Sequence, residues 1–201
     1  LPHWRQDGAT YFVTFRLGDS IPKEKLQQWN KERAEWLAAH PEPHDAATKR
    51  EYYERFPQRF QHWLDQGTGS CVLGKPELKK VVEDALSHFD GTRYRLREFV
   101  VMPNHVHMLI SPLEEYRLSE ILHSLKSFTA NEINKRLGSK LNPVWQHESF
   151  DHIVRSAEQV ERIRQYIRDN PKYVDEASSF VLRPNVDGAS SSVMHQSVDK
   201  A

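Results

Sequence analysis

The most constraining feature of the sequence is a pair of strand-like segments joined by a very short connection. Residues 94–101 and 105–111 carry strand-forming side chains, and only Met102, Pro103 and Asn104 separate them. A connection this short favours two antiparallel strands paired as a hairpin. Patterns typical of amphipathic helices stand on both sides of it, over residues 76–89 and 118–137. The fold must therefore place one helix before this hairpin and one after it.

Two further strands complete the pattern. Residues 10–17 are β-branched and aromatic and stop at Gly18-Asp19, and residues 152–155 could form a short last strand. The order is then strand, helix, strand, strand, helix, strand, which is the split βαβ, ferredoxin-like pattern of the α+β class. We expect an antiparallel sheet with two helices on one face and the other face open.

Two segments interrupt or extend this pattern. Residues 19–66 are highly charged and keep helical spacing over 22–40 and 46–65, with a break at Pro57, so we expect an inserted helical hairpin. Residues 158–170 predict an extra final helix that ends before Pro171. We expect one catalytic domain over residues 1–176 and a disordered tail over 177–201, which is rich in Ser, Asn and Asp.

The composition of the chain indicates its cellular compartment more clearly than its function. Lys plus Arg equals Asp plus Glu at 28 each, so net charge gives no argument for a nucleic-acid partner. The single cysteine, Cys71, excludes an internal disulfide framework and indicates a reducing compartment. No apolar run approaches the roughly 18 residues that span a bilayer. We therefore expect a cytoplasmic protein with no membrane partner.

Two histidines on the second strand of the hairpin could bind a metal. His105 and His107 are two residues apart, so their side chains leave the same face, while Val106, Met108 and Ile110 point to the other face. On the predicted sheet, this places two imidazoles side by side over the face without helices. A lone His-x-His pattern is also compatible with two partly exposed polar residues.

The predicted last helix carries a second pair of functional candidates. Tyr166 and Asn170 are four residues apart and therefore lie on one face of the helix. A tyrosine here could simply pack on the sheet, and the asparagine could be a helix stop. Near the imidazoles, however, the asparagine oxygen would complete a mixed nitrogen and oxygen site that suits Mg²⁺ or Mn²⁺.

Four separated motifs carry a resemblance to a known family. They are Val101-Met102-Pro103-Asn104-His105-Val106-His107-Met108-Leu109-Ile110, Leu125-Lys126-Ser127-Phe128-Thr129, Val144-Trp145-Gln146 through Phe150-Asp151, and Tyr166-Ile167 to Asn170-Pro171. In this order, they resemble the REP-associated tyrosine transposases, relatives of the IS200/IS605 transposases in the HUH endonuclease superfamily. The resemblance covers about residues 10–173.

The resemblance implies a metal-dependent reaction on single-stranded DNA. His105, His107 and Asn170 would bind the metal, and Tyr166 would attack phosphorus to leave a 5′-phosphotyrosine and a free 3′-hydroxyl. The substrate would be a short palindrome that folds as a hairpin, cut and rejoined by the same site. We expect a monomer; a dimer that exchanges tyrosines, as in related transposases, is the alternative.

Basic residues near these motifs are candidates for DNA contacts. Arg93, Arg95 and Arg97 alternate along a strand, and Lys126 and Arg155 lie near the motifs in sequence. A solvated face is an equally good interpretation of the three arginines, and most charged residues on helices only meet water.

Two other functions compete with this interpretation. Histidine-triad nucleotide hydrolases also alternate histidines on a strand, but the position of their nucleophilic histidine is Leu109 here. A non-catalytic module that binds single strands on the same open sheet is the stronger alternative. Such a module would have no use for His105, His107, Tyr166 and Asn170 as a set.

Overall fold

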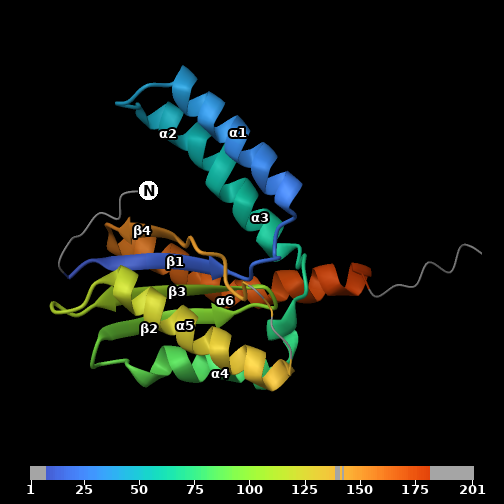
Figure 1. Cartoon of the computed structure of the whole chain (residues 1–201). Coiled ribbons are helices and arrows are strands. Elements are labelled where there is room, and N and C mark those ends of the chain that lie inside the picture. The colour runs from blue at the N-terminus through green and yellow to red at the C-terminus, as the bar shows by residue number, and fades with distance from the viewer. Residues whose placement is uncertain (1–7, 139–140, 142, 182–201) are drawn as a thin grey trace, which may run out of the picture.

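The protein contains a four-stranded antiparallel sheet with helices on both faces (Figure 1). This computed structural model describes residues 8–138, 141 and 143–181, with side chains as far as Asn170. The strand order is β2-β3-β1-β4, the ferredoxin-like order predicted from the sequence. The strands are β1 (Thr10–Arg16), β2 (Tyr94–Val101), β3 (His105–Pro112) and β4 (Phe150–Val154).

Two helices, α4 (Pro76–His88) and α5 (Leu118–Leu137), cover one face of the sheet. Pro76 begins α4 at the position where its missing N–H has no helical partner, and Gly138 ends α5 in the left-handed conformation with φ 61°. Their apolar stripes pack against alternate residues of β1 and β3, including Val13 and Val106. Most of the buried apolar side chains lie in this layer, so we call this side of the sheet the core face.

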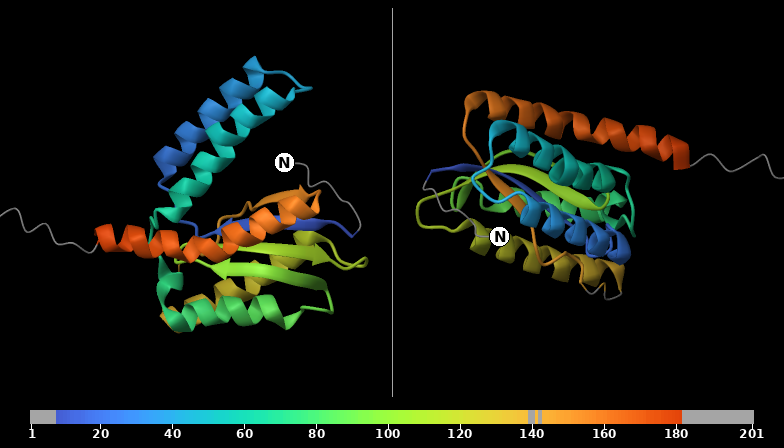
Figure 2. Two further views of the ribbon diagram at one scale, coloured as in Figure 1. Left: turned by 180° about the vertical axis from the view of Figure 1, so that it is seen from behind. Right: turned by 90° about the horizontal axis from the view of Figure 1, so that it is seen from above.

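The opposite face of the sheet is covered by α6 (Ala157–Val181), as Figure 2 shows from above and from behind. α6 packs on β2 and β3, and Glu98 of β2 accepts hydrogen bonds from Arg164 and Arg168 of the helix. The predicted end of this helix at Asn170 is wrong, because α6 continues through Pro171 to Val181. A proline removes one backbone donor and can kink a helix without ending it.

Residues 23–65 form the inserted helical hairpin, which stands away from the sheet on the side of its edge strand β4 (Figure 1). Its helices are α1 (Lys23–Ala39), α2 (Ala46–Tyr53) and α3 (Arg59–Asp65), with the π-helical turn η1 (Glu54–Gln58) between the last two. Pro57 lies in η1, which explains the break in the sequence pattern. Trp29, Trp36 and Phe56 pack edge to face inside the hairpin and hold its two arms together.

Two expectations concern the limits of the chain. Residues 177–181 of the predicted tail continue α6, and residues 182–201 lie outside the described residues. Among the residues that the structure describes, no helix is both long and apolar enough to span a bilayer.

Candidate functional site

The sequence places two imidazoles at the start of β3, on the face that α6 covers. His105 and His107 are fully buried, and their Nε2 atoms lie 2.9 Å apart. The Asn104 amide fixes the orientation of the first ring. Its Nδ2 donates to the carbonyl oxygens of Leu64 and Thr68, so its Oδ1 faces His105 Nδ1 at 2.7 Å and can only accept. His105 therefore carries its proton on Nδ1, which leaves a lone pair on Nε2.

The second imidazole is held by β1. His107 Nδ1 lies 2.8 Å from the hydroxyl oxygen of Thr14, its cross-strand neighbour, and the His107 ring stacks on Phe12. Burial lowers the pKa of His105 to about 3, and burial together with the neighbouring His105 lowers the pKa of His107 well below 6.5. Both rings are thus neutral, the form in which imidazole binds metal ions.

Two oxygen-bearing side chains complete the cluster. Asp65, the last residue of α3, places Oδ1 3.6 Å from His105 Nε2, and the ligand atoms of Asp65, His105 and His107 all lie within 4.8 Å of one another. Burial raises the pKa of Asp65 to about 6, against the lowering effects of Asn170 and His62. Asn170 is fully buried, and neither its Oδ1 nor its Nδ2 forms a hydrogen bond of normal geometry, although its amide lies close enough to Asp65 to affect that pKa.

These atoms fit a divalent cation. Buried polar atoms in native proteins nearly always have partners, yet Asp65 Oδ1 and both polar atoms of Asn170 form no hydrogen bond of normal geometry. Two imidazole nitrogens, a carboxylate oxygen and an amide oxygen form a mixed donor set that suits Mn²⁺ and tolerates Mg²⁺. Asp65 is not among the residues predicted from the sequence, because its isolated position in a charged segment gives no local signal.

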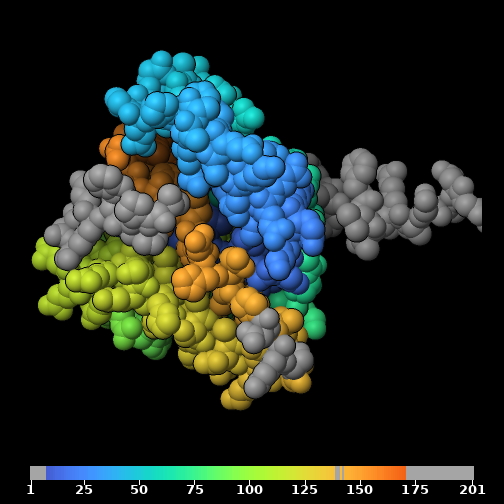
Figure 3. All heavy atoms as spheres, turned by 45° about the horizontal axis from the view of Figure 1, so that its top comes forward, coloured from blue at the N-terminus to red at the C-terminus, as the bar shows by residue number. Residues whose placement is uncertain are grey.

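Tyr166 of α6 faces the imidazole pair. Its hydroxyl lies 3.2 Å from His107 Nε2, and its ring contacts the edges of Phe12 and His107. The tyrosine is half-buried and lines a cavity of about 750 Å³ between the hairpin and the α6 face. Tyr53, Gln58 and His62 form the hairpin side of this cavity, whereas Phe150 and Arg162 form the other side. Figure 3 shows the recess between the hairpin, in blue to cyan, and the orange part of the chain.

The basic residues predicted to contact DNA are more dispersed. Arg95 and Arg97 are exposed on edge strand β2, and Arg155 is exposed between β4 and α6. Arg93 lies over the ring of Phe89, 3.7 Å from its centroid. The structure thus brings His105, His107, Tyr166 and Asn170 together and leaves these four arginines outside the cluster.

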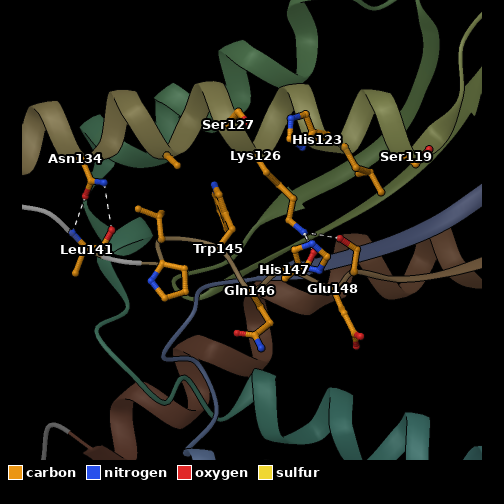
Figure 4. A pocket seen from close by; sticks show the side chains of 15 residues that line it. Ser119, His123, Lys126, Ser127, Asn134, Leu141, Trp145, Gln146, His147 and Glu148 are labelled. Carbon is orange, nitrogen blue, oxygen red and sulfur yellow. Dashed lines mark hydrogen bonds between the residues drawn. The ribbon is translucent and has the colours of Figure 1, made fainter. Parts of the chain in front are cut away.

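Lys126 lines a second cavity, of about 600 Å³, between α5 and residues 141 and 143–149 (Figure 4). Its Nζ donates to the His147 carbonyl and the Ser149 hydroxyl, at 2.8 and 2.9 Å. Burial, followed by the nearby Arg16, lowers the pKa of Lys126 to about 8. None of the four clustered residues lines this cavity, and Lys126 holds the loop that leads into β4.

Fold and site together define a ferredoxin-like α+β protein in which a paired-histidine strand faces a tyrosine-bearing helix. Residues 73–170 match the family described as "Transposase IS200 like", and this segment contains His105, His107, Tyr166 and Asn170. This segment, which is just under half of the chain, is thus similar to the IS200-like transposases.

Individual related proteins share less than 30% of their residues with this chain. A Haemophilus influenzae protein without an assigned function is 29% identical over 97 residues, which cover 38% of this chain and 54% of that protein. The chain thus spans about half the length of this curated relative. A solved REP-associated tyrosine transposase bound to a REP hairpin is 15% identical, with 100% and 99% of the two chains covered and a TM-score of 0.45. A transposase candidate from Deinococcus radiodurans R1 is also 15% identical, with 85% and 96% covered and a TM-score of 0.38.

Proposed function

We propose that the protein is a metal-dependent endonuclease and strand transferase for single-stranded DNA, with Tyr166 as its nucleophile. The observation that carries the proposal is the Tyr166 hydroxyl, 3.2 Å from His107 Nε2 and beside a cluster of buried, metal-ligating atoms. The similarity of residues 73–170 to a transposase family supports DNA cleavage and rejoining as the activity. The cavity next to Tyr166 gives a strand access to its hydroxyl.

Cleavage and rejoining follow from phenol chemistry. Tyr166 Oη forms a bond to phosphorus, and the bond from phosphorus to the 3′-oxygen of the other fragment breaks. The phenol loses its proton, and the departing 3′-oxygen gains one. The product is a 5′-phosphotyrosine with a free 3′-hydroxyl. Because the phosphodiester energy is kept in the covalent link, attack by a 3′-hydroxyl rejoins the strand and releases Tyr166.

His105, His107 and Asn170 would hold the metal, Mg²⁺ or Mn²⁺. When bound, it supplies a positive charge that polarises the scissile phosphate and stabilises charge growing on its oxygens. Asn104 and Thr14 orient the two imidazoles through their Nδ1 atoms, so that both Nε2 atoms face the same point. All of these residues come from one chain, as does Tyr166, which supports a monomer as the active form.

The DNA that we propose as substrate is a REP-like palindrome folded as a hairpin with an adjoining single strand. Phe150 and Tyr53 line the cavity and offer ring faces on which unpaired bases can stack. We propose that Arg93, Arg95, Arg97, Arg155 and Lys126 contribute phosphate contacts. Arg95, Arg97 and Arg155 are the best placed of these, because they are exposed.

The test is a covalent-adduct assay. The protein is incubated with labelled single-stranded palindromes and Mg²⁺ or Mn²⁺, and protein–DNA species that survive denaturation are counted. We expect an adduct that requires metal and disappears in Tyr166→Phe. Tyr116→Phe is the matched control, since Tyr116 is 36% exposed and does not line this cavity.

Two outcomes would overturn the proposal. An adduct retained by Tyr166→Phe would show that another residue is the nucleophile. Full binding of hairpin DNA without cleavage under either metal would identify the protein as a non-catalytic binding module on the same fold.

A further inference from the structure

The inserted hairpin ends inside the proposed metal site. Near its start, α3 contacts β1 through Phe60, whose ring lies under Arg16, and through Gln61 Nε2, 3.4 Å from Thr14 Oγ1. Its last residue, Asp65, lies beside His105, and the Asp65 side chain is 19% exposed. Trp29, Trp36 and Phe56 hold the two arms of the hairpin together. Asp65 is thus the carboxylate that the insertion places beside the paired imidazoles.

The position of Asp65 is set by the sheet as well as by the hairpin. Asn104, the residue before His105, donates through Nδ2 to the carbonyls of Leu64 and Thr68, on both sides of Asp65. The same amide orients His105 through Oδ1. One side chain therefore fixes both the imidazole and the carboxylate relative to each other.

Among the described residues, no group forms a hydrogen bond of normal geometry with Oδ1 of this carboxylate. His105 carries its proton on Nδ1, so the Nε2 atom that faces Asp65 at 3.6 Å offers it no hydrogen. Asp65 Oδ1 is buried and forms no hydrogen bond of normal geometry. An unpaired buried carboxylate is costly unless a cation or a metal compensates it.

We propose that Asp65 is a fourth protein ligand of the metal, so that the inserted hairpin contributes directly to the catalytic centre. The carboxylate adds one negative charge to a site whose other donors, two imidazoles and an amide, are neutral. A hard divalent cation is bound more tightly by such a set. The proposal rests on the metal site proposed above, and the experiment separates the two.

The first measurement is Mn²⁺ binding by titration calorimetry and by the loss of the free-ion electron paramagnetic resonance signal. We expect Asp65→Asn to weaken Mn²⁺ binding at least about 10-fold. Glu54→Gln is the matched control, because it removes one exposed carboxylate from the same hairpin and should leave the affinity unchanged. Metal-free Asp65→Asn should be no less stable than the native protein, since the substitution removes an uncompensated buried charge.

A second variant tests whether residue 65 coordinates the metal directly, through the gain of a signal and not through a loss of affinity. Asp65→Cys places a thiolate at the position, and soft thiolate ligands favour Cd²⁺ over Mn²⁺. We expect Cd²⁺ to produce a sulfur-to-metal absorption band in Asp65→Cys. The native protein, which keeps Cys71, should show no such band.

The outcomes are distinct. If the native protein binds no Mn²⁺, the proposed metal site itself is wrong. If it binds Mn²⁺ and Asp65→Asn binds equally well, or Asp65→Cys gives no band, Asp65 is not a ligand while the proposed function stands. A metal-free Asp65→Asn that is clearly less stable would instead assign Asp65 a structural role, as a partner of Asn170.

Discussion

The two faces of the sheet are built from alternate residues of the same strands, yet they carry different side chains. On β3, Val106, Met108 and Ile110 pack under α4 and α5, whereas His105 and His107 lie under α6. The α6 face has only a small apolar cluster, made of Phe12, Leu109, Val154 and Ile167. Because strand side chains alternate with a period of two, one strand can stabilise the fold on one side and bind ligands on the other.

The two faces of the sheet also contribute differently to the stability of the fold. Burying imidazole, amide and carboxylate groups stabilises a fold less than burying aliphatic side chains does, unless each polar atom has a partner. The α6 face carries several such groups, including polar atoms that form no hydrogen bond of normal geometry. The core face offsets this cost through its apolar layer, so a substitution should act on stability or on chemistry according to the face it changes.

The largest expected effect follows from His107→Ala. The substitution removes one of the two imidazole donors and should weaken Mn²⁺ binding by more than about 100-fold, with loss of the covalent DNA adduct. Titration calorimetry gives the affinity, and His123→Ala, an exposed histidine on α5, serves as the control. Native-like Mn²⁺ affinity in His107→Ala would contradict the claim that the α6 face of the sheet binds the metal.

Substitution of the next residue, Met108→Ala, should lower stability and leave metal binding unchanged. Met108 is fully buried on the core face, and its truncation should lower the free energy of unfolding by about 2–5 kcal/mol. Urea denaturation measures the loss. Below the denaturation midpoint, Mn²⁺ affinity should remain native, and a coupled loss of affinity would show that the two faces are not separable.

Metal addition should stabilise the protein through the α6 face alone. At a free Mn²⁺ concentration about 100 times its Kd, the free energy of unfolding should rise by about 2.7 kcal/mol, provided that the unfolded chain does not bind the ion. Urea denaturation with and without Mn²⁺ provides the measurement. The increase should vanish in His107→Ala and persist in Met108→Ala; an equal increase in all three proteins would indicate binding elsewhere.

The smallest expected effect comes from the tyrosine on the core face. Tyr94 is buried and donates to the Leu86 carbonyl at 2.6 Å, so Tyr94→Phe should cost about 1 kcal/mol and leave the adduct intact.

The same tyrosine predicts a pH dependence. Burial raises the pKa of Tyr94 from 10.0 to about 12, so the unfolded chain loses this proton first as pH rises. Its contribution to stability should be complete below pH 10 and decline towards pH 12. Denaturation curves across this range should show the decline in the native protein and a weaker one in Tyr94→Phe. Equal slopes would contradict a buried, neutral phenol.

Much of the fold could be predicted because it is encoded in local periodicity. The alternation on β3, the stripes of α4 and α5, and Gly138 as the end of α5 all act over a few residues. The end of α6 was predicted wrongly because Pro171 disturbs one turn of a helix that nevertheless continues to Val181.

The site was predictable only in part. The spacing of His105 with His107, and of Tyr166 with Asn170, is enough to indicate that each pair shares one face of its element. Asp65 lies 40 residues before His105 in the chain and reaches it through the hydrogen bonds of Asn104. No local pattern encodes such a contact, so only the three-dimensional structure places Asp65 in the cluster.

The central claim is that the phenol of Tyr166 attacks DNA beside the paired imidazoles. Its most direct test is peptide mass spectrometry of the covalent product after digestion of both protein and DNA. The account predicts a 5′-linked nucleotide on the peptide that contains Tyr166 and on none of the other six of the seven tyrosines. A nucleotide on any other residue, or DNA cut without a covalent intermediate, would contradict it.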